Sequence, residues 1–288
     1  MGEKRILTVQ DISCVGQCSL TVALPILSAC GLETCVLPTA VLSTHTGGFS
    51  GYTFRDLTED MPAIAEHWRR EGIGFDAFYT GYLGSVAQIS HVLAMMNVLG
   101  KPGALRVVDP AMADSGTLYA GFTDAFVEAM RPLCSLADVI LPNLTEACLL
   151  SGIPYRTEYD GAYVESILDA LMAVGAPVIV LTGVSYDEKT TGVVVRDDRG
   201  TLYYRHKKVE RLCHGAGDVF ASALVGAAMN GVDWRRAAEM AADYTVACIE
   251  NTVKDPSHWY GVYFESVLPD FVRRLQQAVG SSGKAPTM

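Results

Sequence analysis

Short apolar runs alternate with longer helical segments along almost the whole chain. Strands are predicted where β-type apolar runs stop at turn residues, at 6–10, 34–37, 77–80, 105–109, 139–141 and 178–181. Helices are predicted between these runs, at 20–29, 56–70, 86–99, 123–134, 145–150 and 162–174. Strands that alternate with helices of this length are typical of βαβ units. We therefore expect an α/β fold with a mainly parallel central sheet and helices on both of its faces.

The alternation changes in the last third of the chain. Two β-rich runs, 191–196 and 201–205, flank a turn that ends in glycine, Asp197-Asp198-Arg199-Gly200. This pattern predicts an antiparallel hairpin at an edge of the sheet. Three more helices are expected after it, at 218–230, 234–250 and 263–278. No linker or repeat divides the chain, so we predict one domain over residues 1–279 and a disordered tail over 280–288.

Composition narrows the class of protein. Of the 288 residues, 50% are hydrophobic and 19% are charged, which predicts a large core and excludes global disorder. The net charge of −10 argues against nucleic acid or an anionic membrane as the partner, but leaves a small anionic ligand possible. We see no signal-peptide pattern and no apolar run long enough to span a bilayer, and so expect a cytoplasmic protein.

Eight cysteines are scattered through core-like sequence. The spacings Cys14-x3-Cys18 and Cys30-x4-Cys35 lack the paired C-x2-C pattern of a structural zinc site. A disulfide framework is typical of much smaller secreted chains. We therefore expect free thiols, most of them buried.

The strongest chemical signal is the turn Gly215-Ala216-Gly217-Asp218, which is followed at once by a long apolar run. The run predicts a buried helix that begins at or near Asp218. Glycines let the backbone turn tightly, and a helix N-terminus presents N–H groups to an anion. Asp218 is then either a helix cap or a base directed at a substrate hydroxyl beside a bound phosphate.

Ligands of open parallel sheets bind beyond the carboxyl ends of the strands. The predicted strands end in polar or glycine-rich elements, at Asp11, 43–48, Gly81-Tyr82, Asp109-Pro110, Pro142-Asn143 and Thr182-Gly183. Asp109 and Glu146 are the candidate ligands for Mg²⁺, which prefers hard oxygen atoms. The alternatives are an Asp-Pro turn for Asp109 and a first-turn acid favoured by the helix dipole for Glu146.

Three other features remain ambiguous by themselves. His45 is either a loop histidine or a ligand-binding residue, and Tyr82 is one of thirteen tyrosines. The basic run Arg205-His206-Lys207-Lys208 either neutralises nucleotide phosphates or protects a solvated edge strand. Neither a Walker A motif nor Gly-x-Gly-x-x-Gly is present, so any phosphate site is of a different kind.

The motifs in chain order resemble the ribokinase-type superfamily and, within it, the pyridoxal kinase family. The resemblance extends from about Arg5 to Leu275. It rests on Val9-Gln10-Asp11, Ser43-Thr44-His45-Thr46-Gly47, Thr80-Gly81-Tyr82, Asp109-Pro110-x3-Asp114, Pro142-Asn143-x2-Glu146 and Gly215-Ala216-Gly217-Asp218. The last motif is common to the superfamily, whereas the His-Thr-Gly and Asp-Pro-x3-Asp segments favour the vitamin kinases.

The resemblance implies phosphorylation of the 5′-hydroxymethyl group of a B6 vitamer by ATP. Asp218 would be the general base, and the backbone N–H groups of Gly215, Ala216 and Gly217 would form an anion hole. Asp109 and Glu146 would hold Mg²⁺, directly or through water. The nucleotide would be bound by Asn143, Thr182, Arg205, Lys207 and Lys208, and the pyridine ring by Asp11, His45, Thr46 and Tyr82. The resemblance also implies a homodimer and leaves open a monovalent cation such as K⁺.

Two residues depart from the pattern that the family commonly shows. Ala216 replaces a threonine, which should preserve a cradle built from backbone N–H groups. Asp11 replaces a serine, and an acid there favours a pyridinium or an amine-bearing substrate such as pyridoxamine. The alternatives are a hydroxymethylpyrimidine kinase of thiamine synthesis, a ribokinase-type sugar kinase and a non-catalytic vitamer-binding protein.

Overall fold

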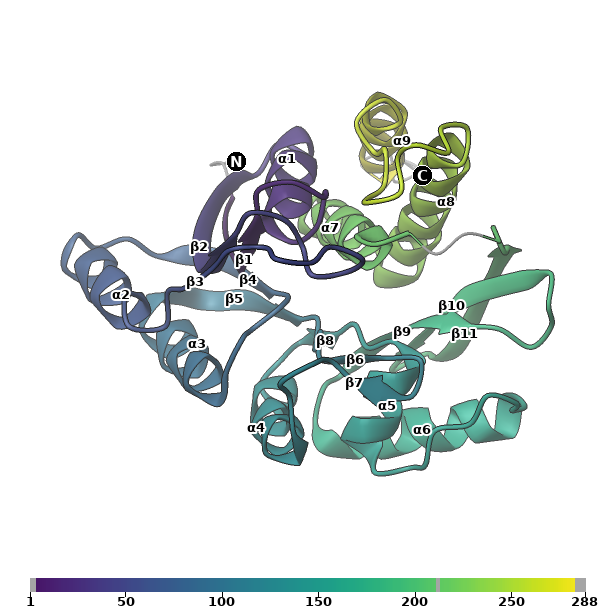
Figure 1. Ribbon diagram of the computed structural model, residues 1–288, viewed down its shortest axis with the longest axis horizontal. Coiled ribbons are helices and arrows are strands. Elements are labelled where there is room, and N and C mark those ends of the chain that lie inside the picture. The colour runs from purple at the N-terminus through teal and green to yellow at the C-terminus, as the bar shows by residue number, and fades with distance from the viewer. Residues whose placement is uncertain (1–3, 211–212, 283–288) are drawn as a thin grey trace, which may run out of the picture.

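The computed structural model describes residues 4–210 and 213–282. A central sheet of nine strands crosses the molecule (Figure 1). In spatial order its strands are β11 (Gly200–Lys207), β10 (Thr190–Asp197), β9 (Val178–Val184), β8 (Val139–Ile140), β5 (Gly100–Val108), β4 (Phe75–Thr80), β1 (Arg5–Ser13), β2 (Glu33–Leu42) and β3 (Phe54–Asp56). A separate two-stranded sheet is formed by β6 (Ala113–Asp114) and β7 (Thr117–Leu118).

Strand directions follow the predicted pattern. The six strands from β2 to β9 pair in parallel, and their buried runs are rich in Val, Ile, Leu and Phe, as strands covered on both faces require. The predicted hairpin is β10–β11, which pairs antiparallel at the edge next to β9. The opposite edge is closed by β3, antiparallel to β2.

Helices cover both faces of the sheet (Figure 1). One face carries α1 (Leu20–Ala29), α7 (Ala216–Met229), α8 (Trp234–Thr252) and α9 (Leu268–Ser282). The other carries α2 (Met61–Arg70), α3 (Val86–Leu99), α4 (Asp124–Ser135), α5 (Leu144–Ser151) and α6 (Gly161–Val174). Each face buries its own hydrophobic cluster, so the three-layer α/β fold expected from the sequence is confirmed.

The C-terminal helix differs from its predicted bounds. It begins at Leu268 rather than Tyr263, because the Tyr263 N–H donates to Thr252 Oγ1 at 2.8 Å and Pro269 suits the first turn of a helix. It extends to Ser282, so the first three residues of the expected tail are helical. Residues 283–288 lie outside the described part of the chain.

Two further sequence expectations can be compared with the fold. No disulfide joins the cysteines within residues 4–210 and 213–282, and the expected burial holds for four of the eight, Cys30, Cys134, Cys148 and Cys248. None of the helices in the described ranges combines the length and the hydrophobicity that crossing a bilayer requires.

Candidate active site

Helix α7 begins directly after a left-handed glycine. Gly215 is the N-cap residue, with φ of 82°, and a Cβ there would overlap the carbonyl oxygen of Gln17. Both observations require glycine at this position. The helix starts two residues before the predicted start, so Ala216, Gly217 and Asp218 form its first turn. The N–H groups of a first turn have no partner within their helix and face the space before it.

Asp218 does not cap the helix. The N-cap is Gly215, and no side chain makes a capping hydrogen bond at this end. Burial raises the pKa of Asp218 to about 7; the Ser19 backbone N–H opposes this shift and the negative charge of Asp11 adds to it. A carboxyl group that titrates near neutral pH is suited to accept a proton, so the structure favours the base over the cap.

Polar residues from four parts of the chain surround one cavity of about 320 Å³. Asp218 and the Gly215–Gly217 turn lie on one side of it. The other lining residues follow strand ends: Asp109 comes after β5, Asn143 and Glu146 after β8, and Thr182 near the end of β9. Of the predicted strand-end residues, the structure thus brings Asp109, Asn143 and Thr182 together at one cavity.

Glu146 has a structural function that the sequence alternative anticipated. Its Oε2 accepts the Asn143 N–H at 2.8 Å while Asn143 Oδ1 accepts the Glu146 N–H at 3.0 Å, which forms a capping box at the start of α5. Its Oε1 accepts the Met112 N–H at 3.1 Å. These bonds hold Glu146 in place beside the segment that follows Asp109.

Asp109 and Glu146 together fit a magnesium ion that also binds nucleotide phosphates. Burial raises the pKa of both carboxyl groups, that of Glu146 to about 8, and Glu146 adds to the shift at Asp109. A bound cation would relieve this repulsion. Within residues 4–210 and 213–282, no group of three or more His, Cys, Asp or Glu is arranged to hold a metal. Mg²⁺ needs no such group, because it keeps several waters and uses one or two carboxylates.

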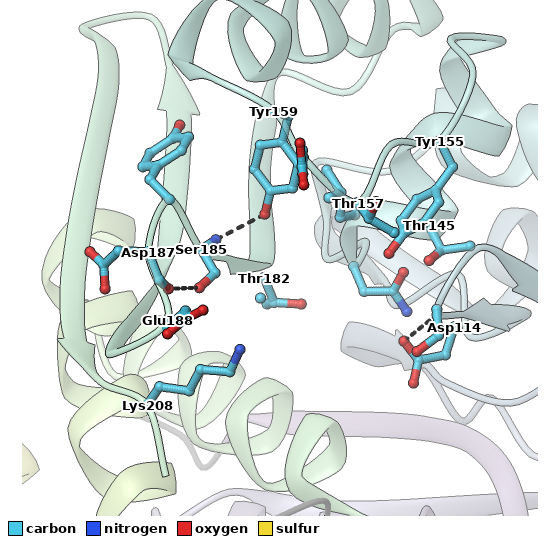
Figure 2. A pocket seen from close by; sticks show the side chains of 16 residues that line it. Asp114, Thr145, Tyr155, Thr157, Tyr159, Thr182, Ser185, Asp187, Glu188 and Lys208 are labelled. Carbon is cyan, nitrogen blue, oxygen red and sulfur yellow. Dashed lines mark hydrogen bonds between the residues drawn. The ribbon is translucent and has the colours of Figure 1, made fainter. Parts of the chain in front are cut away.

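A second cavity of about 480 Å³ adjoins the first and shares Asp114, Asn143 and Thr182 with it. Figure 2 shows Lys208 extending toward the part of this cavity where Thr182 and Glu188 lie. Three tyrosines that sequence reasoning did not identify also line it: Tyr155, Tyr159 and Tyr186. Tyr159 is fixed by its hydroxyl, which accepts the Ser185 N–H at 2.9 Å.

The side chains of the basic run lie in three different environments. Lys208 lines the second cavity. Arg205 forms an ion pair of 2.6 Å with Asp187, which also lines that cavity. Lys207 is 74% exposed and lies 3.7 Å from Glu250 on α8. Lys208 is therefore the member of the run best placed to meet a ligand, and the nucleotide roles of Arg205 and Lys207 stay predictions.

The expected ring-binding residues, Asp11, His45, Thr46 and Tyr82, are absent from the linings of these two cavities. Asp11 is buried, accepts the Ser13 hydroxyl at 2.9 Å and interacts electrostatically with Asp218. Tyr82 stacks on Phe122 with 5.6 Å between ring centroids. Thr46 is exposed.

His45 is buried with a defined tautomer. Its Nδ1 accepts the Gly47 N–H at 3.0 Å, so Nε2 carries the proton and donates to the Tyr260 carbonyl at 2.8 Å. Its ring lies 5.0 Å from the ring of His214, which lines the first cavity. His214 also packs so closely on Gly47 that a Cβ there would overlap it. The His-Thr-Gly loop thus meets the turn before α7, a contact that sequence reasoning missed although His214 adjoins the motif.

Comparisons with known proteins agree with this arrangement. The model of the phosphomethylpyrimidine kinase family matches residues 24–261. A Bacteroides thetaiotaomicron protein provisionally assigned as a phosphomethylpyrimidine kinase and crystallised with pyridoxal is 36% identical, with a TM-score of 0.89 over 94% of this chain and 96% of its own. The pyridoxal kinase of Lactobacillus plantarum is 33% identical, with a TM-score of 0.88 over 95% and 98% of the two chains.

A three-layer α/β fold with a glycine-turn anion site and an acidic residue on the following helix is the architecture of the ribokinase-like small-molecule kinases. The chain belongs to the phosphomethylpyrimidine kinase family of that superfamily. Its curated relatives include the pyridoxal kinase of Arabidopsis thaliana, 26% identical over 87% of this chain and 83% of that protein. The family resemblance of the motifs is thereby confirmed.

Proposed function

We propose that the protein transfers the terminal phosphoryl group of ATP to the 5′-hydroxymethyl group of a B6 vitamer. The observation that supports this most directly is the cavity that joins Asp218, the Gly215–Gly217 turn and the two acids Asp109 and Glu146. The similarity to pyridoxal kinases supports the choice of substrate class.

Asp218 would accept the proton of the substrate hydroxyl as its oxygen attacks phosphorus. Its raised pKa, about 7, makes it a stronger base than an ordinary aspartate while part of it remains ionised at neutral pH. The N–H groups of the first turn of α7 would stabilise the negative charge on the transferred group, aided by the positive end of the helix dipole. Phosphoryl transfer depends mainly on such positioning and charge stabilisation.

The nucleotide would occupy the second cavity, with its phosphates toward the first. Asn143 and Thr182 line both cavities and would bind near the phosphates, while Lys208 supplies a positive charge. Asp109 and Glu146 would hold Mg²⁺, the latter through water because its oxygens already accept backbone N–H groups. When bound, the ion neutralises charge on the phosphates.

The pyridine ring would be held on the β1 side by Asp11, His45, Thr46 and Tyr82. The fixed tautomer of His45 and the buried position of Asp11 support this assignment, because both groups keep defined orientations without ligand. Asp11 also interacts with the proposed base, which would place the ring next to the reacting hydroxyl.

The second candidate is phosphorylation of hydroxymethylpyrimidine, a pyrimidine related to the substrate that names the phosphomethylpyrimidine kinase family. Both reactions would use the same base, anion site and metal ligands. The two reactions differ in the ring that is recognised, so only a direct comparison of the two substrates distinguishes them.

We also propose that the enzyme is a cytoplasmic homodimer. Support for a dimer comes from apolar side chains exposed at the β3 edge of the sheet, where Phe54 on β3 is 49% exposed and Tyr52 just before it is 39% exposed. Light scattering of the purified protein would measure the mass directly.

The test of the proposed function is a substrate panel with ATP and Mg²⁺, run with and without K⁺. Pyridoxal, pyridoxamine, pyridoxine and hydroxymethylpyrimidine are compared by kcat/KM, and the products are identified by mass. We expect a B6 vitamer to be the best substrate. Preference for the pyrimidine would reassign the substrate, and inactivity on all four would contradict a vitamin kinase.

A further inference from the structure

Gln88, in the first turn of α3, is a polar side chain in the core of the protein. It is 1% exposed, and the other buried residues of its helix are all apolar. A buried amide needs partners for its donors and its acceptor, so its hydrogen bonds show which groups it holds. The spacing Ser85-x2-Gln88 is that of a capping box, in which the glutamine side chain would accept the N–H of Ser85.

The side chain of Gln88 does not complete that capping box. Ser85 Oγ accepts the Gln88 N–H at 3.2 Å, which is the first half of the motif. Gln88 Oε1 instead accepts the N–H of Gly84, at 2.7 Å. Its Nε2 group donates to the Thr39 carbonyl at 3.0 Å and to Thr58 Oγ1 at 2.8 Å. The amide thus joins α3 to the loop after β4, to β2 and to the turn after β3.

Two of these contacts hold the loop segment that carries Tyr82. Gly84 lies two residues after Tyr82 on the same loop. Thr39 holds the loop from β2, since its hydroxyl donates to the Tyr82 carbonyl at 3.3 Å. Before Tyr82, the Gly81 N–H donates to a carbonyl of β1 at 3.2 Å. The backbone around Tyr82 is therefore fixed at three points, and Gln88 supports two of them.

The ring of Tyr82 is connected to the first cavity through two aromatic side chains. It stacks on Phe122, with 5.6 Å between the ring centroids and 24° between the ring planes. The Phe122 ring lies 6.5 Å from that of Tyr119, which lines the first cavity together with Asp109 and Asp218. A shift of the Tyr82 loop would therefore change an aromatic wall that reaches the proposed site of phosphoryl transfer.

We propose that Gln88 is a positioning residue, which places the Tyr82 ring against the pyridine ring of the substrate through its hydrogen bonds to Gly84 and Thr39. The inference rests on the proposed function, because that function assigns Tyr82 to the substrate ring. An apolar residue of similar size would fill the same space in the core, but an amide meets an N–H and a carbonyl at once. This accounts for a residue type that is mostly exposed in proteins at a buried position.

The test is Gln88→Met, which keeps the length of the side chain and removes its hydrogen bonds. We expect KM for the best substrate of the panel to rise about tenfold, with kcat within about threefold of wild type, because the base and the anion turn are unchanged. Tm should fall as well, since the Gly84 N–H and the Thr39 carbonyl lose this partner. Thr39→Val, which removes only the hydroxyl on the Tyr82 carbonyl, should also raise KM.

Ser85→Ala is the matched control. It removes the N-cap oxygen of the same helix and leaves the amide contacts of Gln88 in place. Tm should fall by about 1–4 °C while KM stays within about twofold of wild type. In a Tyr82→Leu background, Gln88→Met should cause no further rise in KM, because the ring that it positions is absent. A glutamine with a purely structural role would lower Tm and leave KM unchanged.

Three results would overturn the proposal: unchanged KM in folded Gln88→Met, an equal rise of KM in Ser85→Ala, or a full additional KM effect in the Tyr82→Leu background. If Gln88→Met does not fold, unchanged KM in Thr39→Val overturns the proposal instead.

Direct titration with pyridoxal, followed by its absorbance, separates this test from the proposed function. If wild type binds pyridoxal but phosphorylates no vitamer, the function fails, while weaker binding by Gln88→Met still supports the positioning role. A wild type that binds neither pyridoxal nor hydroxymethylpyrimidine would overturn both.

Discussion

At the residue scale, the behaviour of Asp218 follows from its position in the first turn of α7. Burial and the nearby charge of Asp11 raise its pKa, and the Ser19 N–H only partly offsets them. A carboxyl group with this pKa is suited to the proposed role of general base. Its titration should give activity and stability opposite dependences on pH.

We predict that kcat/KM rises with pH through about 7 and levels off at higher pH, because only ionised Asp218 accepts the hydroxyl proton. The contribution of Asp218 to the free energy of unfolding depends on pH in the opposite direction. Because its pKa in the folded protein lies above the usual 3.8, this stabilising contribution is fully present below about pH 4 and is lost as pH rises through about 7. Asp218→Asn should therefore remove the decrease of Tm between about pH 4 and 7. A kcat/KM that does not change with pH in the wild type would contradict the assignment of Asp218 as the general base.

The two proposed metal ligands should respond differently to neutralisation. Asp109 is destabilised as an anion by burial, Glu146 and Asp218, so Asp109→Asn should raise the Tm of the ligand-free protein by about 2–4 °C while lowering kcat/KM at least tenfold. Glu146→Ala should lower Tm, because it removes the side chain that forms the capping box of α5. Calorimetry without Mg²⁺ measures both effects, and stabilisation by Glu146→Ala would contradict the contrast.

Asp11 gives a prediction about the choice of vitamer. A buried acid near the ring favours a substrate that carries an amine or a protonated ring, so Asp11→Ser should lower the pyridoxamine to pyridoxal ratio of kcat/KM about tenfold. The ratio is measured for wild type and variant under one set of conditions. Equal kcat/KM values for the two vitamers in both proteins would refute this preference.

At the element scale, the edge hairpin places neighbouring lysines in different environments. Lys208 lines the second cavity, whereas Lys207 lies near Glu250 on α8. We predict that Lys208→Ala raises KM for ATP about tenfold and that Lys207→Ala, its matched control, changes it far less. Equal effects of the two substitutions would mean that the nucleotide binds over the outer face of the hairpin.

Element prediction succeeded where burial gives a clear pattern. The predicted bounds of α1 and α3 coincide with the observed Leu20–Ala29 and Val86–Leu99, since both are long apolar segments with turn residues beyond them. Three short strands were missed. The residues of β3 are all exposed, and β6 and β7 contain two residues each, so none shows a hydrophobic alternation. Part of the segment predicted as the start of α2 is β3 and the turn after it.

The site was predictable to the extent that it follows from strand order. Asp109, Asn143 and Thr182 meet because parallel strands end at one edge of the sheet. His214 and the tyrosines Tyr155, Tyr159 and Tyr186 could not be identified, because they reach the cavities through loop packing that no local pattern encodes.

At the scale of the whole molecule, charge explains why the site needs a cation. The chain carries a net charge of −10. Four of its acidic residues, Asp11, Asp109, Glu146 and Asp218, lie in the proposed site, where the substrate nucleotide is also an anion. Backbone N–H groups, Lys208 and Mg²⁺ are the compensating charges in this account. The fold brings them together by placing α7 opposite the ends of β5, β8 and β9.

The most direct test of the central claim is a single-turnover reaction of pyridoxal, or of the best vitamer in the panel, with γ-labelled ATP and Mg²⁺. It is run with wild type and Asp218→Asn, after calorimetry has shown that both bind ATP. The account predicts labelled vitamer 5′-phosphate from wild type and a rate lower by about 10²–10⁴-fold in the variant, with ATP affinity retained. Near-normal transfer by Asp218→Asn, or no labelled product from wild type, would contradict it.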